Sequence, residues 1–327
     1  MTVLLFLGAL ALIAAASELF TNAVEWAGHL LHLGSGATGS LLAALGTALP
    51  ETMVVVVALV GGSSDSGQIA IGAVLGSSFL LLTLGGAITG AALLTRSGAH
   101  QLHAEPAQIR RDLGVFLSAF GCAVASTLLS RPERVVIGVL LLLLYAGYAR
   151  ATLGERGAGG DAPEPLHFVR WRAGPPPWSL VAAQLATGAI LLAVGSGLFV
   201  DAIHSAAPGL GLSALLVAVV AVPFATELPE CLNSVLWVRS GDDGLAIGNV
   251  AGAAAFQACV LGFVGLSFTT WELGSAGLLS AACAFATGLY LLGLLRGGRA
   301  HGGWLLVAAL PWLGFVAAEL VLSGRLG

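Results

Sequence analysis

Long apolar runs of about 20 residues, almost free of charge, recur along nearly the whole chain. A helix needs about 20 such residues to cross the hydrocarbon layer of a membrane, which is roughly 30 Å thick. Strands of a membrane barrel would alternate polar and apolar residues over about ten positions, and this alternation does not occur. Charged residues make up 9% of the chain, whereas soluble domains carry about a quarter. The sequence therefore predicts an all-α integral membrane protein.

Clusters of Gly, Pro, Arg and Asp separate these runs and predict about ten membrane-spanning helices. The expected spans are 3–27, 38–60, 68–94, 113–129, 134–150, 178–203, 212–238, 244–266, 272–295 and 303–322. The first run could pass for a signal peptide, but no basic residue precedes it, so we assign it as a membrane helix. The connection at 151–177 is rich in Gly and Pro, which predicts an unpacked loop between two five-helix halves, 1–150 and 178–327.

The distribution of basic residues predicts the orientation. All 13 basic side chains are arginines. If the N-terminus lies outside the cell, only Arg131, Arg134 and Arg325 fall in outer loops, and the other arginines are cytoplasmic. The positive-inside rule favours this arrangement, so we expect a multi-pass protein of the cell membrane, inner or plasma, with its N-terminus outside.

The two halves contain matching segments. The segment "GTALPE" (46–51) matches "ATELPE" (225–230), at the same offset that aligns "SELFTNAVEWA" (17–27) with "SGLFVDAIHSA" (196–206). After a short gap, the stretch that contains residues 72–78 matches the one that contains 248–257. Because each half has an odd number of spans, the second copy is inserted upside down. Such inverted repeats are typical of secondary transporters, which bind their substrate where the repeats meet.

Each repeat also places a Pro-Glu pair inside a predicted span, as Pro50-Glu51 and Pro229-Glu230. Proline has no N–H and crowds the carbonyl one turn earlier, so it frees backbone oxygens close to the carboxylate. One alternative is a proline kink with a protonated glutamate bonded to a neighbouring helix. The recurrence of the pair at matching repeat positions favours an ion site instead.

The oxygen atoms of the two motifs suit a hard cation. Ca²⁺ takes six to eight oxygen ligands from carboxylates, carbonyls and hydroxyls. Facing each other, the motifs would supply Glu51, Glu230 and the hydroxyls of Thr47 and Thr226. A bound cation is an adequate physical reason to keep two carboxylates inside a membrane, where each charge costs at least a few kcal/mol.

These motifs resemble those of the cation/calcium antiporters, which include sodium/calcium exchangers. Their repeats carry G-T-S-x-P-E on one helix and G-N-x-x-G-S-N on the next, and the resemblance covers essentially the whole chain. The residues kept here are Gly46, Thr47, Pro50, Glu51, Gly72, Gly76 and Ser77 in the first repeat, and Thr226, Pro229, Glu230, Gly248, Asn249 and Gly252 in the second. The resemblance implies that Glu51 and Glu230 are the principal calcium ligands, helped by the carbonyls of Thr47 and Thr226.

The sequence departs from this pattern at positions that bind sodium in sodium-coupled members. The serine of G-T-S is replaced by Ala48 and Glu227, and the polar residue after G-S is Ser78 in one repeat but Ala254 in the other. Glu227 and Glu230 would share a helix face if the helix continued through the proline. Such a pair could exchange a proton or give one cation a third ligand. Alternatively, Glu227 points away from the site toward another polar group.

Gln257 is a possible lining residue of this site, although packing between helices is its favoured role. Asp242 and Asp243 fall in a predicted short loop and are expected to be solvated. The four cysteines lie in apolar segments without metal-ligand spacing, so neither a disulfide nor a zinc site is expected. The net charge of −4 comes without a basic patch, which argues against nucleic-acid binding.

The sequence thus predicts a secondary antiporter that moves Ca²⁺, or a similar divalent cation, in exchange for Na⁺ or H⁺. It is expected to need no cofactor, and its partners are inorganic cations and the lipid bilayer. One alternative is a cation channel or a transport-inactive sensor with the same fold. An intramembrane protease is disfavoured, because no paired catalytic Asp, HExxH or GxSxG motif is present.

Overall fold

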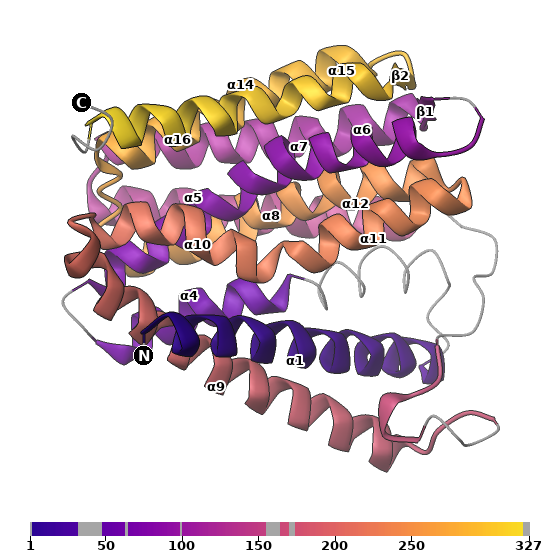
Figure 1. The fold of residues 1–327 in the computed structure, drawn as a ribbon, viewed down its shortest axis with the longest axis horizontal. Coiled ribbons are helices and arrows are strands. Elements are labelled where there is room, and N and C mark those ends of the chain that lie inside the picture. Colours follow the sequence, from indigo (N-terminus) through magenta and orange to yellow (C-terminus); the bar gives the residue numbers. More distant parts are fainter. Residues whose placement is uncertain are drawn as a thin grey trace.

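A computed structural model describes residues 2–31, 48–62, 65–98, 100–154, 164–169 and 174–322. The helices run roughly along one direction, with α1 and α9 side by side along one edge of the bundle and α14 along the opposite edge (Figure 1). The helices in the first half are α1 (Thr2–Leu30), α4 (Leu49–Gly61), α5 (Ser66–Leu80), α6 (Gly86–Thr95), α7 (Pro106–Ala125) and α8 (Arg131–Gly154). Those in the second half are α9 (Trp178–Leu210), α10 (Ala214–Thr226), α11 (Leu228–Ser240), α12 (Asp243–Phe256), α13 (Gly262–Phe268), α14 (Gly274–Leu295), α15 (Gly302–Leu306) and α16 (Leu310–Leu322).

Eight helical segments in the described part of the chain are long and apolar enough to cross a membrane. They correspond to eight of the ten expected spans, with ends that differ by a few residues. The other two expected spans, 38–60 and 212–238, do not form long helices in the described residues. Residues 38–47 lie outside the described part, and the second span is divided into α10 and α11. The total of ten spans is therefore not confirmed.

Proline explains where the helices divide. Pro50 occupies the first turn of α4, and Pro229 occupies the first turn of α11. The sequence predicted that both prolines lie inside continuous helices, and the structure differs in this respect. The first turn tolerates proline because its N–H would have no helical partner there. Glu227 is the single residue between α10 and α11. The motif "TELPE" therefore ends one helix and begins the next.

The interior of the bundle is formed by one long segment from each repeat. In the segment Ser66–Thr95, 94% of the residues of its most apolar stretch are buried, and in Asp243–Phe268 the share is 78%. The corresponding share is 11% in Arg131–Thr152 and 17% in Gly302–Leu322. Helices α5–α6 and α12–α13 thus form the core, while α8 and α15–α16 carry the lipid-facing side chains.

Both core segments contain a π-helical turn at the same repeat position. The turns are Leu81–Gly85 and Gln257–Leu261. Each begins the same number of residues after the aligned positions Ile69 and Leu245. A π-helical turn inserts one extra residue and changes which side chains face inward, and such turns are frequent at functional sites. The repeat is therefore visible in the backbone as well as in the sequence.

Glycines of α5 allow α10 to pack closely against it. A Cβ atom at Gly72 would lie 2.6 Å from the carbonyl oxygen of Leu215 and 2.7 Å from the Cβ of Ala218. A Cβ at Gly76 would likewise collide with the carbonyl oxygen of Val219. Small residues permit this approach of two backbones, and the close contact fixes α10, which leads directly to the Glu227 break.

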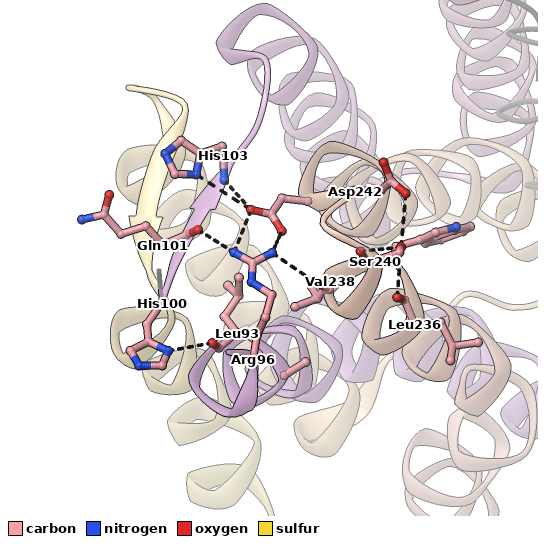
Figure 2. A network of polar contacts seen from close by, with 12 residues as sticks. Leu93, Arg96, His100, Gln101, His103, Leu236, Val238, Ser240 and Asp242 are labelled. Carbon is pink, nitrogen blue, oxygen red and sulfur yellow. Dashed lines mark hydrogen bonds and ion pairs between the residues drawn. The ribbon is translucent and has the colours of Figure 1, made fainter. Parts of the chain in front are cut away.

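A polar network joins the end of α6 to the start of α12 (Figure 2). Nη1 of Arg96 lies 2.5 Å from Oδ1 of Asp243 and also donates to the carbonyl of Val238. The backbone N–H of His103 donates to Oδ2 of Asp243 at 3.0 Å. Asp243 is therefore buried and paired, and our expectation that it is solvated is wrong. Its charge is compensated by an arginine from the other repeat, 147 residues away in sequence.

Two short strands lie beside this network. Strand β1 (Gln101–His103) pairs in antiparallel register with β2 (Arg299–His301), so that Leu102 faces Ala300 across the pair. The sequence did not predict these strands, because three residues are too few to establish an alternating pattern. The pairing joins the loop after α6 to the loop after α14.

Part of the central loop is packed, contrary to our expectation. Leu166 is 2% exposed and lies with Trp26 of α1 and Val181 of α9 in a small apolar cluster. The indole N–H of Trp26 and the side-chain amide of Asn22 both donate to the carbonyl of Glu164. The described residues 164–169 are thus anchored to the first helix of each repeat.

Candidate functional site

The two Pro-Glu motifs place their glutamates in equivalent backbone positions. Glu51 lies in the first turn of α4 and Glu230 in the first turn of α11, and both side chains are fully buried. The positive end of the helix dipole favours a carboxylate there, and proline positions the start of each helix. The sequence of each motif therefore directs one buried carboxylate into the interior of the bundle.

Gln257 connects carboxylates from the two repeats. Its Nε2 atom lies 2.9 Å from Oε1 of Glu227 and 3.3 Å from Oε1 of Glu51, within hydrogen-bond distance of both. Gln257 is fully buried and is the first residue of the second π-helical turn. One amide group thus brings together a glutamate that follows α10 and a glutamate of α4.

Ser78 completes this chain of contacts. Its hydroxyl donates to Oε1 of Gln257 at 3.2 Å, which orients the amide so that its nitrogen faces the two glutamates. Ser78 belongs to α5 of the first repeat and Gln257 to the second, so the contact crosses the interface between the repeats. The hydroxyl of Thr226 lies 3.4 Å from Oε1 of Glu227. Hydroxyl and amide groups therefore surround the carboxylates.

The second carboxylate oxygens of Glu51 and Glu227 are available as ligands. Oε2 of Glu51 and Oε2 of Glu227 are buried and accept no hydrogen bond in the described part of the chain. Neither of these glutamates has a basic ion-pair partner among the described residues. Glu51 and Glu230 also interact electrostatically. Such a concentration of negative charge in an apolar interior favours the entry of a cation.

The backbone around Glu230 is held by a second set of polar side chains. Its carbonyl oxygen accepts from the hydroxyl of Ser234 at 3.0 Å and from the amide of Asn249 at 3.3 Å. Asn249 is the asparagine of the G-N-x-x-G pattern and lies on α12. Asn249 therefore fixes the position of α11 relative to α12. The same contact fixes the backbone from which the Glu230 side chain extends.

Six ligands are expected from the sequence, and five of them lie in the described part of the chain. Glu51 and Glu227 share an amide, Ser78 contacts that amide, Thr226 contacts Glu227, and Glu230 lies on the same broken helix, whereas Thr47 lies outside the described residues. No three His, Cys, Asp or Glu side chains in the described part of the chain are close enough together to hold one metal ion. The ligand assignment stays a prediction.

Gln257 contacts more of the expected ligands than its sequence position indicates. Its only sequence signal is one amide within the apolar run "AGAAAFQACVLG". A buried polar side chain in a membrane helix needs a partner, but the sequence does not say which helix supplies it. Glu227 and Glu51 accept from the same amide, so the polar group that Glu227 contacts also contacts the glutamate of the first repeat. The role of Glu227 as a ligand stays a prediction.

Comparisons with known proteins identify the family of the chain. The family model described as "Sodium/calcium exchanger protein" matches residues 1–154 and 180–321. The putative antiporter CaxA of Alkalimonas amylolytica is 27% identical over 291 residues, which cover 86% of this chain and 83% of that protein. The inner membrane protein YrbG of Escherichia coli (strain K12) is 28% identical over 229 residues, which cover 68% of this chain and 66%, just under two thirds, of that protein.

Two kinds of solved exchanger share the fold. The crystal structure of the H⁺/Ca²⁺ exchanger CAX matches with a TM-score of 0.76 at 17% identity, covering 98% of this chain and 82% of that one. A structure of the sodium-calcium exchanger NCX_Mj matches with a TM-score of 0.63 at 21% identity, covering 97% of each chain. These matches confirm the predicted all-helical membrane fold. By its match along both halves, the chain belongs to the sodium/calcium exchanger protein family, as the resemblance implied, and is a multi-pass membrane transporter rather than an enzyme.

Proposed function

We propose that this protein is a secondary antiporter that moves Ca²⁺, or a similar divalent cation, across the cell membrane in exchange for Na⁺ or H⁺. The observation that carries the proposal is the meeting of Glu51 and Glu227, from opposite repeats, at the amide of Gln257. Buried carboxylates with unoccupied oxygens are hard ligands of the kind that Ca²⁺ prefers. Their position at the interface between inverted repeats is where secondary transporters bind their substrates.

In this proposal, a cation is held by Glu51 and Glu230 with help from Glu227, Ser78, Thr226 and Thr47. The oxygens of these side chains would have to converge on the ion as it enters, because Ca²⁺ takes six to eight oxygen ligands. The cation would then take over the role of the Gln257 amide, which contacts Glu51 and Glu227 in this structure. Binding of the cation and of the coupling ion at the same oxygens makes the exchange obligatory.

The divided helix α10–α11 supports a transport cycle. The break at Glu227 lets the two helical halves move separately, while α5 and α12 remain packed as the core. Transport sites at the ends of discontinuous helices become accessible from alternate sides when one part of the bundle moves against the other. We infer that the N-terminus lies outside, because the arginine distribution favours that orientation.

The coupling ion is the finer part of the proposal. The relatives include both an H⁺/Ca²⁺ exchanger and a sodium-calcium exchanger by name. In this chain Ala48, Glu227 and Ala254 stand where the family pattern has Ser, Ser and Asn, so sodium loses neutral polar ligands. Ca²⁺ uptake under separate Na⁺ and H⁺ gradients distinguishes the two coupling ions.

The test uses the full-length protein in liposomes, with labelled Ca²⁺ uptake measured under an imposed Na⁺ gradient and then under an imposed H⁺ gradient. We expect saturable uptake that requires one of the two gradients. Glu51→Gln and Glu230→Gln should each abolish it while the protein still inserts. The matched control is Glu133→Gln, since Glu133 lies in the first turn of α8 and, within the described part of the chain, accepts hydrogen bonds only from exposed Ser130. Uptake under neither gradient, or unchanged uptake in the Glu51 and Glu230 variants, would refute the proposal.

The channel alternative makes a different prediction for the same liposomes. A channel would carry Ca²⁺ down its own gradient without a counter-ion, and its flux would not saturate in the same concentration range. A transport-inactive sensor would bind Ca²⁺ without any uptake. Counter-ion dependence and saturation therefore separate the three possibilities in one preparation.

A further inference from the structure

A cavity of about 590 Å³ lies at the end of the bundle opposite to the Arg96 network, and the cation site does not use it. It is formed by the connection between α7 and α8 and by the loop from Phe268 to Leu273. Its polar lining includes Thr127, Ser130, Arg131, Arg134, Thr270 and Glu272. The question is which ligand such a cavity would accept.

Two arginines give the cavity its positive charge. Arg131 and Arg134 begin α8 and, three residues apart on a helix, lie on the same face. Neither forms an ion pair with a carboxylate in the described part of the chain. The nearest acidic residue in sequence, Glu133, is instead bonded to the N–H and hydroxyl of Ser130, at 2.8 Å and 2.7 Å. The acidic residue in the lining is Glu272, on the opposite wall, so the two arginine charges exceed the negative charge of the lining.

The guanidinium of Arg134 is held in place but only partly used. Its Nη1 donates to the carbonyl of Thr270 in the opposite wall. Its Nε is buried and has no hydrogen-bond partner in the described residues. A buried N–H without a partner costs free energy, and an anionic oxygen would satisfy it. Arginine presents its donors in a planar arrangement that matches the oxygens of a phosphate.

The position of the cavity defines the ligand further. It lies at the ends of four candidate membrane spans, Pro106–Leu128, Arg131–Thr152, Asp243–Phe268 and Gly274–Leu295. Large apolar side chains at these ends are exposed, with 89% of Leu128, 61% of Phe268 and 48% of Leu278 accessible. An exposed apolar surface at the end of membrane spans contacts lipid. The ligand would thus combine an anionic group with an adjacent hydrocarbon chain.

Arg131 and Arg134 are also unusual in the distribution of basic residues along the chain. With the N-terminus outside, Arg131 and Arg134 lie on the side where the chain carries few basic residues. The positive-inside rule alone does not account for two of them within one turn of a helix. A specific ligand for their charges does.

We propose that this cavity binds the phosphate of an anionic membrane phospholipid, with Arg131 and Arg134 as its ligands and Phe268 and Leu278 against the acyl chains. Basic pockets between transmembrane helices bind lipid head groups on the cytoplasmic side of membranes, and the pairing of arginine with a phosphate is the same chemistry on the outer side. A free inorganic phosphate would satisfy the arginines but would leave the apolar rim without a partner. The two sources of phosphate therefore differ in whether the acyl chains contribute to binding.

The test is native mass spectrometry of the purified full-length protein, titrated with phosphatidylglycerol, with zwitterionic phosphatidylcholine and with inorganic phosphate. We expect phosphatidylglycerol to bind more tightly than either of the others. Arg131→Gln and Arg134→Gln should each weaken that binding by about tenfold, which is the loss of one charge-assisted contact. Glu272→Gln should strengthen it, because it removes the one negative charge in the lining.

Arg150→Gln is the matched control, since it removes the same charge from the opposite end of the same helix. It should leave the tight binding of phosphatidylglycerol unchanged. If Arg134→Gln fails to fold because Thr270 loses its donor, Arg131→Gln and Glu272→Gln still decide the matter, as both of these side chains are exposed. Equal binding of the two lipids, equal binding of inorganic phosphate, or an equal loss in Arg150→Gln would overturn the proposal.

Discussion

The side chain of Gln257 donates to Glu227 across 2.9 Å and thereby holds a carboxylate that no basic residue in the described chain neutralises. The same nitrogen also reaches Glu51. An N–H group between two carboxylates is a neutral substitute for a cation, because it presents partial positive charge to both. Removal of this group should therefore affect the ion-free protein more than the ion-loaded one.

The first prediction concerns the substitution Gln257→Leu, which keeps the volume of the side chain and removes its donors. We expect the free energy of unfolding of the ion-free protein to fall by about 1–3 kcal/mol, because buried carboxylate oxygens lose their hydrogen bonds. Saturating Ca²⁺ should recover part of this loss, since the cation replaces the amide. Thermal unfolding of the purified protein with and without Ca²⁺ measures both effects.

Gln184→Leu is the control for this prediction. Gln184 is also a fully buried amide with several hydrogen bonds, but its partners are Asn22, Leu19 and Phe168. Its substitution should destabilise the protein to the same extent whether or not Ca²⁺ is present. Equal recovery by Ca²⁺ in both variants would contradict the special role of Gln257.

The second prediction concerns the contact between α5 and α10. In Gly72→Ala the added Cβ would meet the carbonyl oxygen of Leu215 at 2.6 Å, and backbone atoms cannot move aside easily. We expect a loss of about 1–3 kcal/mol in unfolding free energy, together with slower transport, because α10 leads to Glu227. Gly67→Ala on the same helix meets no atom within 4 Å. That change should be neutral or stabilising by about 0.5–1 kcal/mol, and a similar loss in both variants would argue against the close contact.

The third prediction concerns the pair formed by Arg96 and Asp243. Arg96→Gln leaves Asp243, which is 5% exposed, without its counter-charge, and should destabilise the protein by about 3 kcal/mol. The double variant Arg96→Gln with Asp243→Asn should recover part of this loss, because no uncompensated charge is left. Arg239→Gln, which removes an exposed arginine of α11, should have little effect. Chemical denaturation of these proteins, together with the single variant Asp243→Asn, tests the coupling, and strictly additive losses would disprove it.

The fourth prediction concerns the anchored part of the central loop. Leu166→Ala should create a cavity between α1 and α9 and release residues 164–169, with a cost of about 2–3 kcal/mol. Hydrogen exchange of this segment should then become faster, while exchange in α5 and α12 stays unchanged. The matched variant Leu236→Ala removes a side chain that is 62% exposed, and it should alter neither. Unchanged exchange at 164–169 in Leu166→Ala would show that the cluster does not hold the loop.

The sequence by itself determined the fold class, the approximate limits of eight spans and the matching motifs of the two halves. These features are local, because the length of an apolar run decides whether a helix can cross a membrane, and two copies of one motif are recognised without any structure. The family resemblance followed from the same local motifs around Glu51 and Glu230. What proline would do was only partly predictable, since Pro50 and Pro229 begin helices and do not kink continuous ones.

Only the tertiary structure decided which polar residues meet. Gln257 and Glu51 are 206 residues apart, and Arg96 and Asp243 are 147 apart, so no sequence period relates them. A buried polar group must find a partner, but any helix of the bundle could in principle supply it. The packing of the two core segments, with their π-helical turns in equivalent places, selects Glu51 and Glu227 as the partners of Gln257, and Arg96 as the partner of Asp243.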